Sequence, residues 1–174
     1  YRIAETESVI TPGGRAVWMG TDTNGLARLE GGRWTAFDMT SGLPHLGVTA
    51  ISETGGGAEP RTVWVGTHGG LVRYVDGRFE AVDAGGETLR LIAIVKPIGK
   101  KVGSAPWVVG PGKLGRLEGG RLTFYDIPKG IPDRFLNVFE TVDADEQFFV
   151  TFIFPTAMGP VEEGGFCGMV VHLS

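Results

Sequence analysis

The histidines are the residues of this sequence best suited to bind a metal ion or to move protons near neutral pH. There are three in the 174 residues, His45, His68 and His172. They fall in different strand contexts, and no local spacing such as HxxxH joins any two of them. A metal centre would need ligands from separate segments, and the sequence predicts neither a metal ion nor another cofactor.

Carboxylates offer a second kind of chemistry. Asp22 and Asp133 could form the acid pair of a glycosidase, a reaction in which the separation of the two carboxyl groups decides the outcome. The sequence contains no HExxH, GxSxG or Walker-type string that would mark another hydrolase or a nucleotide-binding site. We expect a protein without catalytic activity, and a glycosidase or lyase is the weakest of the functions considered.

Polar residues also gather between strand-like segments, where a rigid scaffold usually carries its binding groups. We take the following as candidates for contact with a ligand: Asp22, Asn24, His45, His68, Lys113, Asp133 and Arg134. Each of these residues by itself also suits the ordinary chemistry of a turn. A binding site requires that the fold bring them to one face.

The elements that would position these residues follow from a pattern that occurs three times, as LARLEGGRW from Leu26, LVRYVDGRF from Leu71 and LGRLEGGRL from Leu114. Each copy centres on a glycine-containing dipeptide between alternating segments, which is typical of a β-hairpin with a two-residue turn. Such turns predict these cross-strand pairs: Glu30 with Arg33, Leu29 with Trp34, Arg73 with Glu80, Tyr74 with Phe79, Leu117 with Leu122, and Glu118 with Arg121. We expect the hairpin arginines to be structural.

A second motif, VWMGT, VWVGT or PWVVGP, precedes each hairpin and places tryptophans at Trp18, Trp64 and Trp107, with Phe149 in a weaker fourth copy. With the β-rich runs between the units, each period contains four strands, which is typical of propeller blades. The sequence therefore predicts an all-β protein, a β-propeller of four-stranded antiparallel blades with about four repeats in this chain. The approximate repeat units are residues 1–38, 46–83, 88–126 and 134–174.

The repeated motif also predicts which residues have architectural roles. Each tryptophan can fill the wedge between neighbouring blades, and the glycine near it allows the backbones to approach. The residues in these roles are Trp18, Trp64, Trp107, Gly20, Gly66 and Gly110. His172 occupies the position of the hairpin arginines, so we expect it to be structural too. The polar segment ETGGGAEPRT at residues 53–62 is expected to be a surface loop.

The fourth unit ends in what should be its third strand, which leaves an unpaired edge. An unpaired edge invites association, for example as a homodimer, and a propeller normally closes by joining its first and last blades. We expect the chain to be a fragment of a larger ring of about six to eight blades, within the known range of roughly four to eight. The alternative is that the insertion after Phe154 covers this edge, and a small four-bladed ring is the second architecture considered.

Composition narrows the class of protein. The chain has 29 glycines and 10 prolines but is 42% hydrophobic, which indicates a turn-dense β protein and not a disordered one. Its net charge of −4, without a basic stripe, argues against a nucleic-acid partner. Cys167 is the single cysteine, so the chain has no intramolecular disulfide. No run of 18 apolar residues occurs, so we expect no membrane segment in this chain.

The strings WMGTDTNGLARL, WVGTHGGLVRY and WVVGPGKLGRL, with the connections SGLPHLGV and KGIPDRFL, resemble the two-component regulator propeller repeats. That family forms the sensory region of bacterial hybrid histidine kinases and related membrane-anchored receptors. The match covers nearly the whole chain. It departs at Pro111, at AGGETL in place of GLP, and in the eroded fourth copy.

The resemblance implies a module that binds a small molecule, such as a saccharide, and signals to a domain elsewhere in the full-length chain. It also implies a periplasmic or extracellular location, in a membrane-anchored or secreted protein. The ligand should meet the face formed by the turns between second and third strands and the crossovers between blades. A passive scaffold that docks another protein is the alternative, since a fold alone does not determine function.

Overall fold

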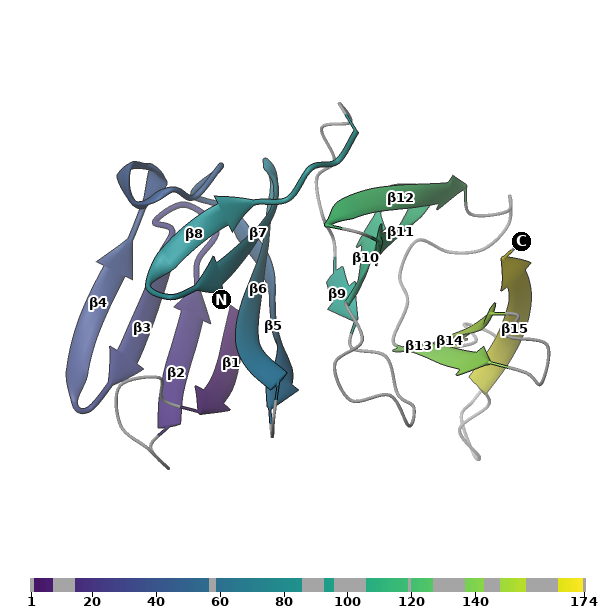
Figure 1. Ribbon diagram of the computed structural model, residues 1–174, viewed down its shortest axis with the longest axis horizontal. Helices are drawn as coiled ribbons and strands as arrows, with labels where there is room; N and C mark the ends of the chain where they lie inside the picture. Colours follow the sequence, from purple (N-terminus) through teal and green to yellow (C-terminus); the bar gives the residue numbers. More distant parts are fainter. Residues whose placement is uncertain are drawn as a thin grey trace.

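The computed structural model describes residues 2–7, 15–56, 59–85, 93–95, 106–118, 120–126, 137–142, 148–155 and 166–173. Within these ranges the protein is all-β, as predicted, and contains β-strands, one short 3₁₀ turn and no α-helix. The strands form antiparallel sheets in which each strand pairs with its neighbours in sequence. Figure 1 shows the sheets following one another in chain order along the long axis.

The first sheet consists of β1 (Arg2–Glu7), β2 (Arg15–Gly20), β3 (Leu26–Glu30) and β4 (Arg33–Phe37). The second consists of β5 (Val48–Gly56), β6 (Glu59–Thr67), β7 (Gly70–Val75) and β8 (Arg78–Ala81). The third consists of β9 (Ala93–Val95), β10 (Trp107–Gly110), β11 (Lys113–Glu118) and β12 (Arg121–Asp126). In the described residues the fourth consists of β13 (Asn137–Val142), β14 (Phe148–Pro155) and β15 (Phe166–Leu173).

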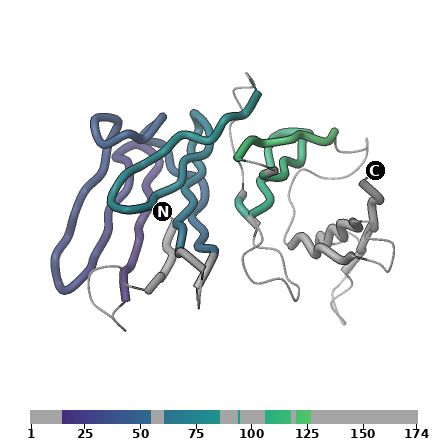
Figure 2. The backbone as a smooth tube through the Cα atoms, in the orientation of Figure 1, coloured from purple at the N-terminus to yellow at the C-terminus, as the bar shows by residue number. Residues whose placement is uncertain are grey.

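The first three sheets meet in succession through their first two strands. Strands β1 and β2 contact β5, and strands β5 and β6 contact β9. In Figure 2 the backbone traces of the first two sheets run side by side. None of the described sheets closes on itself, so the structure establishes a succession of antiparallel sheets.

The hairpin pairings predicted from the three two-residue turns are confirmed. Every predicted pair is a register pair in the structure: Glu30 with Arg33, Leu29 with Trp34, Arg73 with Glu80, Tyr74 with Phe79, Leu117 with Leu122, and Glu118 with Arg121. The turn at Asp76 and Gly77 has φ values of 48° and 82°, the positive values that a two-residue primed turn requires.

The strand pairings also show which residues occupy equivalent positions in the four sheets. Trp18, Trp64 and Trp107 each face an arginine on the next strand, and Phe149 faces His172 in the fourth sheet. The predicted equivalence of His172 with the hairpin arginines is therefore confirmed at the level of the backbone. Side chains of the fourth sheet, including those of His172 and Cys167, lie outside what the structure describes.

One expectation about the second sheet is wrong. Residues 53–62 were expected to form a surface loop, but β5 and β6 extend into this segment and pair as far as Gly56 with Glu59. The register shifts between Val48 and Ala50 and again between Thr54 and Gly56. The second shift lies within the glycine-rich segment, and a bulge of this kind tolerates residues that weaken a regular ladder.

The hydrophobic core lies between adjacent sheets. Between the first and second sheets its buried members are Trp18, Leu26, Leu43, Val48, Val63, Val65, Val72 and Tyr74. Between the second and third sheets they are Trp64, Leu71, Val108 and Leu122. In both cores a tryptophan of one sheet packs against residues of the next. A buried ring of this size removes roughly 150 to 250 Å² from water, so these contacts are a large part of what joins the sheets.

The first two sheets approach each other closely at Gly20. A Cβ atom at this position would lie 2.8 Å from the Cβ of Val48 on β5. At Gly66 a Cβ would lie 3.3 Å from the Thr49 Oγ1 and 3.4 Å from the Ile94 Cδ1, a tight but milder contact. Gly110 is buried at the end of β10.

Candidate functional site

The crossover from β4 to β5 begins with a capped 3₁₀ turn, η1 (Met39–Ser41). The Asp38 Oδ1 accepts hydrogen bonds from the backbone N–H groups of Thr40, at 2.8 Å, and Ser41, at 3.2 Å. The Thr40 hydroxyl donates to the same oxygen and is the largest cause that lowers the pKa of Asp38. Gly42 ends the turn with a φ of 102°, a left-handed value that glycine adopts without strain.

Backbone hydrogen bonds tie three connections together at this end of the sheets. The N–H of Gly25 donates to the Leu46 carbonyl at 3.0 Å, and the N–H of Val48 donates to the Thr21 carbonyl at 2.8 Å. The N–H of His68 donates to the Gly47 carbonyl at 3.0 Å. The β2–β3 loop, the crossover and the β6–β7 turn are thereby held as one surface.

The two histidines predicted as ligand contacts meet on this surface. The ring centroids of His45, in the crossover, and His68, in the β6–β7 turn, are 5.3 Å apart, with an angle of 41° between the ring planes. His45 is exposed and His68 is half-buried. The Gly47 N–H donates to the Nδ1 of His45 at 2.8 Å, which fixes the ring against the crossover backbone.

Gly47 lies next to both imidazole rings and to the β2–β3 loop. A Cβ at this position would lie 2.8 Å from the His68 Nδ1, 3.1 Å from the His45 Nδ1 and 3.0 Å from the Asp22 carbonyl oxygen. A side chain larger than hydrogen would therefore displace the groups that surround it. We call Asp22, His45, Gly47 and His68 the crossover site.

The remaining predicted ligand contacts differ in how they relate to this site. Asn24 is exposed in the same β2–β3 loop, and its backbone N–H donates to the Thr21 Oγ1 at 2.8 Å. Lys113 begins β11 in the third sheet, where its Nζ lies 5.9 Å from the centroid of the Phe124 ring. Asp133 and Arg134 lie outside the described residues, so the proposed pairing of carboxylates at Asp22 and Asp133 stays a prediction.

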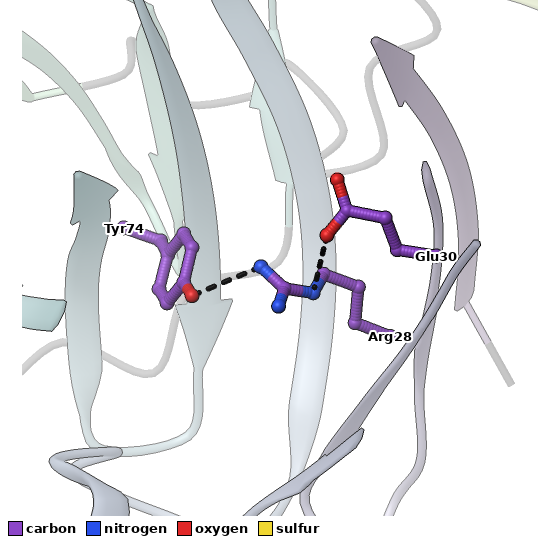
Figure 3. A network of polar contacts seen from close by, with 3 residues as sticks. All are labelled: Arg28, Glu30 and Tyr74. Carbon is purple, nitrogen blue, oxygen red and sulfur yellow. Dashed lines mark hydrogen bonds and ion pairs between the residues drawn. The ribbon is translucent and has the colours of Figure 1, made fainter. Parts of the chain in front are cut away.

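A buried polar network that sequence reasoning did not foresee lies beneath the surface, between the first two sheets (Figure 3). The Arg28 Nη1 donates to the Tyr74 hydroxyl at 3.0 Å, and the Arg28 Nε is 3.3 Å from the Glu30 Oε2. The guanidinium carbon also lies 5.4 to 5.8 Å from the ring centroids of Trp18, Phe37 and Tyr74.

The contacts of Arg28 in this network have a structural role. The side chains of Arg28 and Glu30 are only 11% and 4% exposed. A carboxylate and aromatic faces offset part of the hydration that a buried cation loses, and both lie beside Arg28. The contact of its Nε with the Glu30 Oε2 is an ion pair without hydrogen-bond geometry. The signal available in the sequence was the spacing of 46 residues that places Tyr74 in the next repeat, but spacing alone does not reveal the inter-sheet contact.

The comparisons with known proteins leave the family resemblance as a hypothesis. No protein-family model matches this chain, and no curated protein matches it. Among the residues that the structure describes, no group of three or more His, Cys, Asp or Glu side chains is placed to hold a metal ion. The same part of the chain contains no helix long and apolar enough to cross a membrane.

Proposed function

We propose that this chain is a non-catalytic, ligand-sensing segment of a β-propeller, and that it binds a small molecule at the crossover site. The observation that carries the proposal is the meeting of His45 and His68, from two separate connections, with ring centroids 5.3 Å apart. Both residues were predicted from the sequence to lie on the ligand-binding face. The proposed ligand is a small polar molecule such as a saccharide.

The arrangement of the sheets supports the propeller part of the proposal. The first three antiparallel sheets contact one another in succession, and a tryptophan of each of the first two packs against the next sheet. Propeller blades stack in this way around an axis. The chain is then part of a larger ring, in line with its resemblance to the sensory propellers of bacterial receptors.

The rigidity of the crossover site supports the binding part. Backbone hydrogen bonds already join the three connections, and the Gly47 N–H fixes the His45 ring. A site ordered in advance loses less conformational entropy when a ligand binds. We also propose that a signalling domain elsewhere in the full-length chain receives the change, and that the module lies in the periplasm or outside the cell, as the family resemblance implies.

Binding can be tested by titrating a panel of neutral and acidic mono- and oligosaccharides into the ¹⁵N-labelled chain and following backbone amide signals by NMR. We expect shifts in residues 21–25, 45–47 and 68–69. The double variant Asn24→Ala, His68→Ala should lose these shifts, while its unfolding free energy stays within about 0.5 kcal/mol of the wild type, as is usual for surface loops.

The matched control is Asp76→Asn, in the tip turn of the β7–β8 hairpin, where asparagine tolerates the positive φ. This variant should bind as the wild type does. If no member of the panel shifts the crossover site, the saccharide is wrong as its ligand. If only a protein partner shifts it, the ligand-sensing proposal is wrong and the scaffold alternative takes its place.

A further inference from the structure

We infer that the crossover site recognises an oxygen acceptor, a carbonyl or carboxylate group, and that His45 serves it as a hydrogen-bond donor through Nε2–H. This inference rests on the proposed function, because it names the chemistry of the same site. The observation behind it is the hydrogen bond from the Gly47 N–H to the His45 Nδ1, at 2.8 Å.

That hydrogen bond fixes the tautomer of the ring. A backbone N–H can only donate, so the Nδ1 of His45 must present its lone pair. In a neutral imidazole one nitrogen donates and the other accepts, and the proton is therefore on Nε2. His45 is exposed, and the Gly47 bond occupies its other nitrogen, so Nε2–H is the polar group it offers to a ligand.

The same tautomer disfavours a transition-metal ion at this pair of histidines. Two imidazoles at this separation would otherwise be natural ligands for zinc or nickel. Coordination by the His45 Nε2 would require a lone pair there, and the ring proton would have to move to Nδ1, against the Gly47 N–H. The Gly47 N–H cannot turn away easily, because the Leu46 carbonyl of the same peptide group accepts the Gly25 N–H at 3.0 Å.

Gly47 also limits where the ligand group can lie. The atoms around its Cα already include the Nδ1 of both rings and the Asp22 carbonyl oxygen. An acceptor oxygen placed there would meet the Asp22 carbonyl oxygen, and the Gly47 N–H is already used by His45. The acceptor therefore approaches the Nε2 edge of His45, with the His68 ring as its neighbour.

The tautomer can be read directly from the imidazole nitrogen signals of the ¹⁵N-labelled chain in a long-range proton–nitrogen correlation spectrum. At a pH where His45 is neutral, we expect the Nε2–H pattern. Sodium acetate, and acetamide as its uncharged counterpart, should each shift the His45 Nε2 signal at constant ionic strength. Zinc chloride should leave the Nε2–H pattern in place.

A matched pair of variants separates the two nitrogens of His45. The Oδ1 of asparagine can take the Gly47 N–H in place of Nδ1, so His45→Asn keeps this crossover contact but removes the Nε2 donor together with the ring. We expect wild-type amide signals for Gly47 and His68 in this variant. Its acetate binding should be about tenfold weaker, as expected for one lost hydrogen bond. His45→Ala should lose both the Gly47 contact and the acetate binding.

An Nδ1–H pattern in the free protein, zinc bound by both imidazoles, or unchanged acetate binding in His45→Asn would overturn the inference. Binding of acetate but not acetamide identifies a carboxylate, and equal binding identifies a carbonyl. If neither probe binds while a saccharide of the panel does, the donor inference fails and the ligand-sensing proposal stands. If acetate binds but no saccharide does, the donor inference stands and the proposal of a saccharide as the ligand is wrong.

Discussion

Arg28 faces Trp18 across adjacent strands, with its guanidinium carbon 5.4 Å from the centroid of the indole ring. Arg116 and Trp107 repeat this relationship in the third sheet at the same distance. In the second sheet Arg73 faces Trp64 but forms its ion pair with Glu80 on the outer strand, at 2.7 Å. One repeated position thus has two environments, one buried between sheets and the other exposed.

The first prediction uses this contrast. Arg28→Met should lower the unfolding free energy by about 3 kcal/mol, because it removes the cation of a buried ion pair and the donor to the Tyr74 hydroxyl. Arg73→Met changes the same repeat position, but its ion pair with Glu80 is nearly half exposed and should be worth no more than about 1 kcal/mol. Urea unfolding of both variants measures the difference. Equal losses would show that the Arg28 network does not join the sheets.

The second prediction concerns the tryptophans. Trp64→Ala should cost about 3 to 5 kcal/mol, since the ring is 5% exposed and its Nε1–H donates to the Thr54 Oγ1 at 2.7 Å. Trp34→Ala is the matched control, because this ring is 58% exposed, and the change should stay within about 0.5 kcal/mol. A melting temperature unchanged by Trp64→Ala would contradict the inter-sheet core.

The sequence predicts those parts of the fold that depend on interactions between residues close together in the chain. The hairpin registers could be predicted because a two-residue turn fixes which residues face each other. Residues 53–62 could not, because glycine, proline and charged residues are typical of loops, and only the pairing of β5 with β6 shows that a bulged ladder accommodates them. Trp34 shows the same limit, since its partner Leu29 was predicted and its exposure was not.

The candidate site could likewise be predicted only in part from the sequence. The end of the sheets at which His45 and His68 lie follows from strand order, which the repeat pattern already contains. Their contact depends on the path of the crossover, which is set by the Asp38 cap and by backbone hydrogen bonds between connections. The Arg28 contact with Tyr74 depends likewise on how two sheets pack, a relationship that no local pattern encodes.

The third prediction tests the close approach of the first two sheets. Gly20→Ala should cost about 1 to 3 kcal/mol, the range for overpacking, because the new Cβ would meet the Val48 side chain. Val48→Ala also destabilises by itself, since Val48 is buried. In the double variant the two losses should not add, because the smaller side chain makes room for the methyl group. Strictly additive losses in a double-mutant cycle would show that these residues do not touch.

The fourth prediction concerns acid and the Asp38 cap. Hydrogen bonds, the largest from the Thr40 hydroxyl, lower the pKa of Asp38 below its ordinary value of 3.8. A carboxylate with a lowered folded pKa stabilises the fold above its unfolded pKa, and this contribution disappears as the pH falls through the folded value. The melting temperature of Asp38→Ala should therefore lie below that of the wild type by a constant amount from pH 7 to about pH 5, and the gap should close below about pH 3.8.

Asp38→Asn is the control, because it accepts hydrogen bonds without titrating. The difference in melting temperature between Asp38→Asn and Asp38→Ala should not close at low pH. If the gap between the wild type and Asp38→Ala is the same at pH 7 and pH 2.5, the carboxylate does not cap the crossover, and the path that brings His45 to His68 must be held by the backbone hydrogen bonds alone.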